Sequence, residues 1–278
     1  MNYRHAYHAG NFADAFKHIV LVALIQAMSR KDTPFCFLDT HAGIGIYDLT
    51  DSAAKKSGEA KGGIEKIYAA DKLPVLVRDY LACVTQFNEL APDQLRFYPG
   101  SPGFARRLMR SQDRIVLSEL HEEDFHTLKN NFPHYKQVGI HHQDGYQALK
   151  AFLPPKERRG LILIDPPYEK PNELTTVVNA LAEAVTRFAT GVFALWYPIK
   201  DMRALEKLHN SFRNKLPHPM LITELCIYPE TIGTQLNGCG MLIINPPWQL
   251  HETIKEILPW LWNVLSPNKQ GRYNIISH

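Results

Sequence analysis

Short apolar runs of strand length alternate with longer segments of helical period along most of this chain. The seven runs cover residues 35–39, 114–118, 137–142, 160–165, 191–197, 220–228 and 240–245. Such alternation is typical of a parallel sheet with helices on both faces. Because helical stretches separate the first five runs, we expect those strands to be parallel. The link over residues 229–238 is too short for a crossover helix, so the last two runs should form an antiparallel hairpin.

This order of elements resembles that of class I methyltransferases, in which the last strand reverses within an otherwise parallel sheet. We therefore predict an α/β, Rossmann-like fold with a seven-stranded, mainly parallel sheet and an antiparallel terminal hairpin. A first helix should begin after Asn11, a suitable N-cap residue. Between residues 45 and 114 the chain is far longer than one crossover needs. We assign residues 47–99 to an inserted helical subdomain, and residues 1–46 and 100–278 to the methyltransferase domain.

The composition is that of an ordinary globular protein, with 278 residues, 45% hydrophobic and 21% charged. The longest apolar stretch, residues 19–25, is too short to cross a bilayer. The N-terminal sequence lacks the apolar core of a secretory signal, and the four cysteines form no CxxC pair. We therefore expect a soluble, cytoplasmic protein. His5 and His8 have the spacing of a metal pair, but no carboxylate or cysteine stands at ligand spacing beside them, so no metal is expected.

A glycine-rich loop, FLDTHAGIG over residues 37–45, follows the first predicted strand. Glycine is needed where a backbone turns tightly and approaches a ligand closely, and open α/β sheets bind ligands at the carboxyl ends of their strands. Gly43 is therefore a candidate cofactor-binding residue, although a plain turn would explain it equally well. The spacing differs from GxGxxG, which argues against a nicotinamide cofactor.

Three other positions would complete a nucleoside site at the same edge of the sheet. Glu119 ends the second strand, where an acidic residue can bind ribose hydroxyls. Asp144 and Gly145 follow the third strand, where they could meet an adenine amino group. Ser101, followed by Pro102, begins a predicted helix that could present N–H groups and a hydroxyl to a carboxylate. Each position has a plain structural alternative: a solvated strand end, a common turn and an N-cap.

The strongest motif is GLILIDPPY over residues 160–168, an apolar strand that ends in Asp-Pro-Pro-Tyr. Two successive prolines fix φ and remove two N–H donors, which leaves carbonyl groups free to accept hydrogen bonds. Asp165 and the Pro166 carbonyl could then accept both hydrogens of an exocyclic amine, while Tyr168 offers a flat face to a planar base. This combination favours methyl transfer to the amine of a flipped base.

A near-copy of this motif, Asn-Pro-Pro-Trp, begins at Asn245. The letters alone do not separate the two motifs, because Asn-Pro-Pro-aromatic also serves in amino-methyltransferases. Topology does separate them. Asn245 ends a strand that we predict to be antiparallel, so it should lie at the edge of the sheet opposite Gly43 and Asp165. We therefore predict that the second motif is structural.

Together these segments closely resemble the bacterial 23S ribosomal RNA adenine-N6-methyltransferases over nearly the whole chain. The segments that carry the resemblance are YRHAYHAGNFADAFKH, LDTHAGIG, YPGSP, SELH, RRGLILIDPPYE, ALWYP and NPPW. The resemblance implies a Rossmann-like fold with an inserted helical subdomain, S-adenosylmethionine as methyl donor and protein-free precursor RNA as substrate. By motif, the residues expected at the methyl donor are His18, His41, Ser101, Glu119, Asp144, Gly145 and Asp165. Asp165 would also be catalytic, and Tyr3 would contact the RNA.

Basic and aromatic side chains should hold the RNA. The candidates are Tyr3, Arg4, His5 and Lys17 near the N-terminus, then Arg106, Arg107 and Arg110, and a further cluster of Arg203, Lys207, Arg213 and Lys215. A net charge of +3 permits RNA binding without demonstrating it. We expect a monomer that acts on 23S ribosomal RNA. A DNA adenine methyltransferase, a protein glutamine methyltransferase and a non-catalytic RNA-binding protein remain alternatives.

Overall fold

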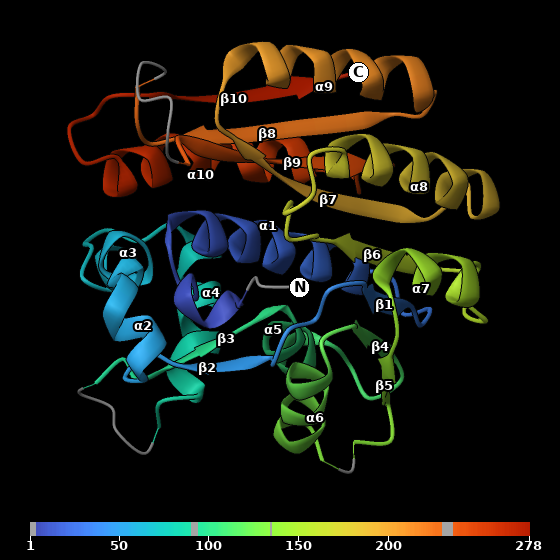
Figure 1. Ribbon diagram of the computed structural model, residues 1–278, viewed down its shortest axis with the longest axis horizontal. Coiled ribbons are helices and arrows are strands. Elements are labelled where there is room, and N and C mark those ends of the chain that lie inside the picture. The colour runs from blue at the N-terminus through green and yellow to red at the C-terminus, as the bar shows by residue number, and fades with distance from the viewer. Residues whose placement is uncertain (1–3, 90–93, 134, 230–235) are drawn as a thin grey trace.

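The computed structural model describes residues 4–89, 94–133, 135–229 and 236–278. Its main sheet has eight strands in the order β10-β8-β9-β7-β6-β1-β4-β5 (Figure 1). The strands are β1 (Cys36–Asp39), β4 (Arg114–Glu119), β5 (Val138–His142), β6 (Gly160–Ile164), β7 (Val192–Ile199), β8 (Met220–Cys226), β9 (Gly238–Ile244) and β10 (Arg272–Ser277). The five strands from β7 to β5 are parallel, and β9 lies antiparallel between β7 and β8. The predicted parallel sheet with a reversed hairpin is confirmed.

The prediction of seven strands was wrong by one. The additional strand, β10, pairs antiparallel with β8 at the edge of the sheet. Its sequence, RYNIIS, has only two adjacent aliphatic residues, and none of its residues is fully buried. An edge strand that is only partly buried lacks the alternation of apolar residues by which strands are predicted.

Helices cover both faces of the sheet, as the pattern predicted. On one face lie α1 (Phe12–Ser29), α5 (Ser101–Leu108) and α10 (Leu250–Leu265), whose apolar residues form one hydrophobic cluster with the sheet. On the other lie α7 (Gly145–Phe152), α8 (Glu173–Arg187) and α9 (Met202–Lys215) in a second cluster. The remaining crossover helix, α6 (Glu122–Asn131), connects β4 to β5. Because the layers alternate along the chain, the loops that follow the parallel strands all open at one edge of the sheet.

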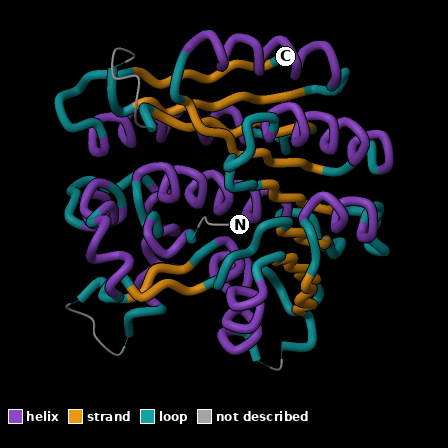
Figure 2. The backbone as a smooth tube through the Cα atoms, viewed as in Figure 1, coloured by secondary structure: helices purple, strands orange, loops and turns teal. Residues whose placement is uncertain are grey.

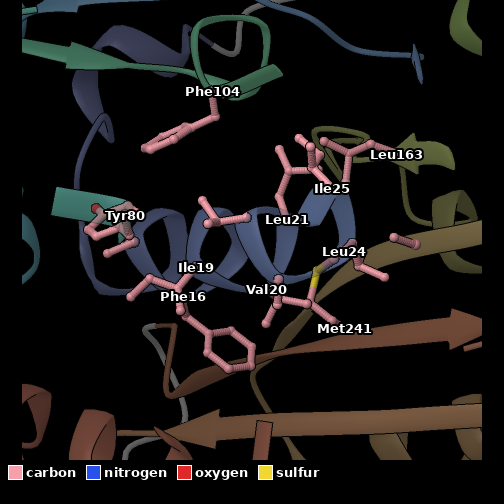
Figure 3. Close-up of a cluster of buried hydrophobic side chains, with 14 of the residues drawn as sticks. Phe16, Ile19, Val20, Leu21, Leu24, Ile25, Tyr80, Phe104, Leu163 and Met241 are labelled. Carbon is pink, nitrogen blue, oxygen red and sulfur yellow. The ribbon is translucent and has the colours of Figure 1, made fainter. Parts of the chain in front are cut away.

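Helix α1 is the centre of the first cluster and is buried on all sides over residues 12–25. The Asn11 side chain caps it, accepting a hydrogen bond from the Asp14 amide at 2.8 Å, as predicted. Phe104 packs against one side of α1 and Met241 against the other (Figure 3). By length and composition α1 could span a membrane, but 83% of it is buried inside the protein, as expected for a core helix.

The segment predicted as an insertion is helical and is closed at its base by a two-stranded antiparallel sheet, β2 (Ile46–Asp48) with β3 (Phe97–Pro99) (Figure 2). Between these strands lie α2 (Ser52–Ser57), a 3-10 turn (Glu59–Gly62), α3 (Ile64–Tyr68) and α4 (Val75–Gln86). Tyr80 of α4 is fully buried and belongs to the same cluster as α1. The segment thus shares the core of the sheet, and its standing as a separate subdomain stays a prediction.

Candidate functional site

The carboxyl ends of the parallel strands open into a cavity of about 830 Å³. The register sets Asp39, at the end of β1, beside Leu117 of β4 and Leu163 of β6, so the loops after these three strands meet at one place. The predicted site residues that line the cavity are His5, Lys17, His18, His41, Gly43, Ser101, Glu119, Asp144, Gly145, Asp165, Pro166 and Tyr168. Arg4 does not line it, and Tyr3 lies outside the described residues.

The loop after β1 has a glycine that no other residue could replace without strain. Gly43 has a φ of 58°, and a Cβ added there would lie 2.2 Å from the Tyr47 hydroxyl. The bare Gly43 amide donates to Oε2 of Glu119 at 2.8 Å. Positive φ and close contact are the two conditions that require glycine. The loop after β1 is thereby tied to the residue that ends β4.

Glu119 is a buried carboxylate held by backbone amides. Its Oε2 accepts from Gly43 and its Oε1 accepts from the His121 amide at 2.7 Å. Burial raises the pKa of Glu119. Each oxygen keeps a second lone pair, because a carboxylate has about four acceptor sites. Glu119 is therefore positioned to accept hydrogen bonds from hydroxyl groups inside the cavity.

The turn after β5 contains a helix cap, Asp144, and a glycine, Gly145, that packs closely against the loop after β1. Asp144 caps α7, since its Oδ1 accepts from the amides of Tyr146 and Gln147. A Cβ on Gly145 would lie 2.4 Å from the Thr40 carbonyl oxygen. The structural explanation of Asp144 thus accounts for one of its oxygens, and Gly145 is required because a side chain there would collide with the loop after β1. Ser101 is the first residue of α5, and Gly100 occupies the N-cap position.

Asp165 follows β6 and is paired with a buried cation. Lys17 Nζ lies 2.6 Å from Asp165 Oδ2 and 2.7 Å from Asp14 Oδ1. Burial alone would lower the pKa of Lys17, but the two carboxylates raise it well above its usual value. We expected Lys17 at the surface as a phosphate contact. Its side chain is instead 6% exposed and joins α1 to the loop that contains Asp165.

The ring of Tyr168 has a fixed position beside Asp165. Tyr168 adopts a φ of 52°, and its hydroxyl donates to the Trp196 carbonyl oxygen at 2.6 Å. The ring centroids of Tyr168 and Trp196 lie 5.7 Å apart. A tyrosine anchored through its hydroxyl and half-buried at the cavity wall can present a flat apolar surface without losing side-chain entropy on binding.

His18 brings an uncharged imidazole to the wall formed by α1. Its Nδ1 pairs with the Tyr98 hydroxyl at 2.8 Å, and its ring lies 4.9 Å from that of Phe104. Burial holds the pKa of His18 well below its usual value, so the ring is neutral. Its Nε2 is buried without a hydrogen-bond partner among the described residues. Such an atom is costly unless a ligand satisfies it.

Comparison with known proteins identifies the family. A family model described as "Ribosomal RNA large subunit methyltransferase D, RlmJ" matches residues 32–276. This chain belongs to that family. "Ribosomal RNA large subunit methyltransferase J" of Escherichia coli K12 is 42% identical over 275 residues, which cover 99% of this chain and 98% of that protein. The protein of the same name from Haemophilus influenzae is 40% identical with the same coverage.

A solved structure confirms the fold of the whole chain. A crystal structure of a protein from Legionella pneumophila superposes with a TM-score of 0.87 at 38% identity, covering 98% of both chains. The chain is thus a ribosomal RNA methyltransferase by family, and S-adenosylmethionine is its methyl donor. The cavity fits such a donor, because Glu119 keeps acceptor positions at its wall beyond its two backbone bonds, and His18 Nε2 lacks a partner among the described residues.

The N-terminal arm of this methyltransferase is paired with acidic residues of the protein itself. Arg4 forms ion pairs with Asp124, at 2.9 Å, and with Glu123, both on α6. His5 lies 3.1 Å from Asp14, and His8 lies 3.0 Å from Glu59 in the helical insertion. We expected Arg4 to contact RNA, but its guanidinium already has carboxylate partners. In the described part of the chain, no cluster of three or more His, Cys, Asp or Glu could hold a metal.

Asn245 occupies the position that topology predicted. Its side-chain Nδ2 donates to the carbonyl oxygens of Ala189 and Gly191 at 2.8 Å each. Its backbone N–H donates to the carbonyl oxygen of Pro219. These partners precede β7 and β8, so Asn245 lies at the amino ends of the parallel strands. The Asn-Pro-Pro-Trp motif is therefore remote from the cavity, at the opposite edge of the sheet.

Several residues of the cavity wall carried no signal in the sequence. Tyr146 donates to Glu173 at 2.8 Å, and Glu173 is buried at the start of α8. Both line the cavity, together with Trp196, Lys170 and Lys200. None belongs to a motif with a chemical reason for its spacing. Their only common signal is that they lie within eight residues of Asp144, of Asp165 or of the end of β7.

Proposed function

We propose that this methyltransferase transfers a methyl group from S-adenosylmethionine to the N6 amine of one adenine in 23S ribosomal RNA, before the RNA is assembled with protein. The observation that carries the proposal is a single cavity with two halves. One half, with Gly43, Glu119 and Gly145, suits a nucleoside. The other, with Asp165, Pro166 and Tyr168, suits a planar base that carries an amine.

The chemical problem is the weak nucleophilicity of the adenine amine, whose lone pair is delocalised into the ring. Asp165 and the Pro166 carbonyl would each accept one N6 hydrogen. These two bonds draw the nitrogen toward a tetrahedral geometry and restore its lone pair. S-adenosylmethionine, when bound, supplies a methyl group on a sulfonium. Positioning and oriented acceptors, which need no reorganisation, then account for much of the rate.

Lys17 determines which role Asp165 can take. Its ammonium, 2.6 Å from Oδ2, stabilises the ionised carboxylate. An ionised Asp165 is acceptor-only, as the amine requires, and Oδ1 stays available to the substrate. The positively charged methylated amine is acidic enough to lose its proton to water, so the proposal does not require Asp165 to be a base. Tyr168 would stack on the flipped adenine.

The residues proposed at the methyl donor are His18, His41, Gly43, Ser101, Glu119, Asp144, Gly145 and Asp165. Glu119 would bind ribose hydroxyls, as at the end of the second strand of other nucleotide-binding sheets. His18 Nε2 and the N-terminus of α5 at Ser101 would bind the polar amino-acid part of the donor. Gly145 would let the adenine ring approach the turn after β5.

Matched substrates test the proposal. Purified protein with labelled S-adenosylmethionine is given 23S ribosomal RNA stripped of protein, an RNA hairpin of the target and a DNA hairpin of the same sequence. We expect N6-methyladenosine, identified by nucleoside mass spectrometry, in both RNAs. Methylation of DNA alone would support the DNA methyltransferase alternative. RNA binding without methyl transfer would support the non-catalytic alternative, and labelled protein would support a glutamine methyltransferase.

A further inference from the structure

The rim of the cavity is divided by charge. On the side of β4, the first turn of α6 carries Glu122, Glu123 and Asp124, of which Arg4 pairs with the last two, so the turn keeps a net negative charge. On the side of β7, Lys170 and Lys200 line the cavity together with Glu169. A polyanion that delivers one base to Asp165 is repelled by the first side and attracted by the second. The charges thus favour one direction of approach.

Helix α9 extends the basic side away from the cavity. It begins at Met202, directly after the carboxyl end of β7, and buries Leu205, Leu208 and Phe212 against the sheet. Arg203 and Lys207, four residues apart, share a face of the helix and are both exposed. We name the four cations Lys170, Lys200, Arg203 and Lys207 the β7–α9 rim.

The side chains of these four cations have no charged or hydrogen-bonding partner among the described residues, whereas several of the RNA contacts predicted from the sequence do. Arg4 and Lys17 are paired with carboxylates, and Arg110 with Asp113. Among the described residues, no side chain of the β7–α9 rim forms an ion pair or a side-chain hydrogen bond. The nearby Asp201 caps α9 by accepting from the Arg203 and Ala204 amides, and the exposed Glu206 is paired with none of the four. Unpaired cations exchange their counterions for phosphates at the lowest cost.

We infer that the β7–α9 rim binds the phosphates of the single-stranded RNA that flanks the flipped adenine. The inference rests on the proposed function, since the base must enter beside Asp165 for its neighbours to lie here. Lys170 and Lys200 would hold the phosphates closest to the target, and Arg203 and Lys207, about 6 Å apart along the helix axis, the next ones. The net negative charge that the first turn of α6 keeps beyond its ion pairs with Arg4 disfavours the opposite rim for the strand.

Helix α9 supplies its own matched control. Arg203→Gln with Lys207→Gln removes an arginine and a lysine from the rim. Arg213→Gln with Lys215→Gln removes the same pair of charges from the last turn, about 14 Å further along the helix; both residues are RNA candidates from the sequence, but the inference assigns no phosphate to them. Arg213 and Lys215 contact only asparagine side chains, Asn210 and Asn179. Unfolding temperature and affinity for S-adenosylmethionine should be unchanged in both double variants.

The readout is binding of the RNA hairpin as a function of salt, alongside methyl transfer. Each lost phosphate contact removes about 0.7 from the slope of log K against log salt for a single strand. We expect the Arg203/Lys207 variant to lose about 1.4 of slope and to show a raised KM with kcat retained, while the Arg213/Lys215 variant matches wild type. Equal slopes and KM in both variants, with wild type active, would overturn the inference alone. A wild-type protein that binds RNA but never methylates it would overturn the proposed function instead.

Discussion

The buried ion-pair cluster around Lys17 allows a quantitative prediction. Lys17→Met keeps the length of the side chain and removes the charge, which leaves Asp14 and Asp165 without their shared cation. Removing one partner of a buried pair costs about 3–5 kcal/mol. We expect the lower end, because Asp14 keeps hydrogen bonds from the Gly10 amide and His5, and Asp165 is 17% exposed. A loss of about 3 kcal/mol lowers the folding equilibrium constant roughly 140-fold, using the tenfold change per 1.4 kcal/mol.

The pH dependence of stability tests whether the charge of Lys17 is the cause of this loss. Burial alone would raise the pKa of Asp14, but the charge of Lys17 holds it well below its usual value. A carboxylate with a depressed pKa stabilises the folded protein above the unfolded value of about 3.9, and this contribution is lost as the pH falls through the folded pKa. Without Lys17, burial raises the pKa of Asp14. The difference in stability between wild type and Lys17→Met should therefore narrow on acidification.

The assay is guanidinium unfolding of wild type, Lys17→Met, Asp14→Asn and the double variant, at pH 7 and near pH 4. If the buried charge is the cause, Asp14→Asn should restore much of the stability that Lys17→Met loses, with a coupling energy above 1 kcal/mol. A loss below about 1 kcal/mol at pH 7, or additive effects in the double variant, would refute the reasoning.

Three further predictions follow from the site. Asp165→Ala should abolish methyl transfer in protein that still folds, with a lowered unfolding midpoint because buried Lys17 keeps only Asp14 as a carboxylate partner; activity near wild type would remove Asp165 from the proposed chemistry. Gly145→Ala places a Cβ 2.4 Å from the Thr40 carbonyl oxygen, so we expect weaker S-adenosylmethionine binding by calorimetry, and unchanged affinity would contradict the packing argument. Asn245→Ala removes two 2.8 Å hydrogen bonds and should cost about 1–3 kcal/mol with turnover preserved in the folded fraction; a selective loss of turnover would mean that the second proline motif has a part in catalysis.

The sequence predicted those residues of the candidate site whose positions depend only on strand order and strand direction. The two prolines after Asp165, the glycine at residue 43 and the acid at the end of β4 each follow a strand, and parallel strands bring their carboxyl ends together. The antiparallel direction of β9 likewise predicted that Asn245 lies away from the cavity. These inferences needed only strand order.

The surroundings of individual side chains could not be predicted from the sequence. Lys17 lies three residues after Asp14, a spacing that suggests a helical ion pair, yet α1 is apolar on every side and gives no sign of which residues face the cavity. Arg4 and Glu123 are far apart in sequence, so their pairing depends on the position of the folded arm. Strand β10 and Glu173 have no pattern of their own, because neighbours distant in the chain determine their burial.

The core that α4 shares with α1 has a consequence for any shortened version of this enzyme. The Tyr98 hydroxyl of β3 pairs with Nδ1 of His18, and the hydroxyl of Tyr80 on α4 in turn lies 3.1 Å from the Tyr98 hydroxyl. Excising the helices between β2 and β3 would strip the outer side of α1 and release a histidine that borders the cavity. A minimal catalytic fragment must therefore retain them, and loss of these helices by proteolysis should inactivate the protein even though no residue of the Asp-Pro-Pro-Tyr motif is cut.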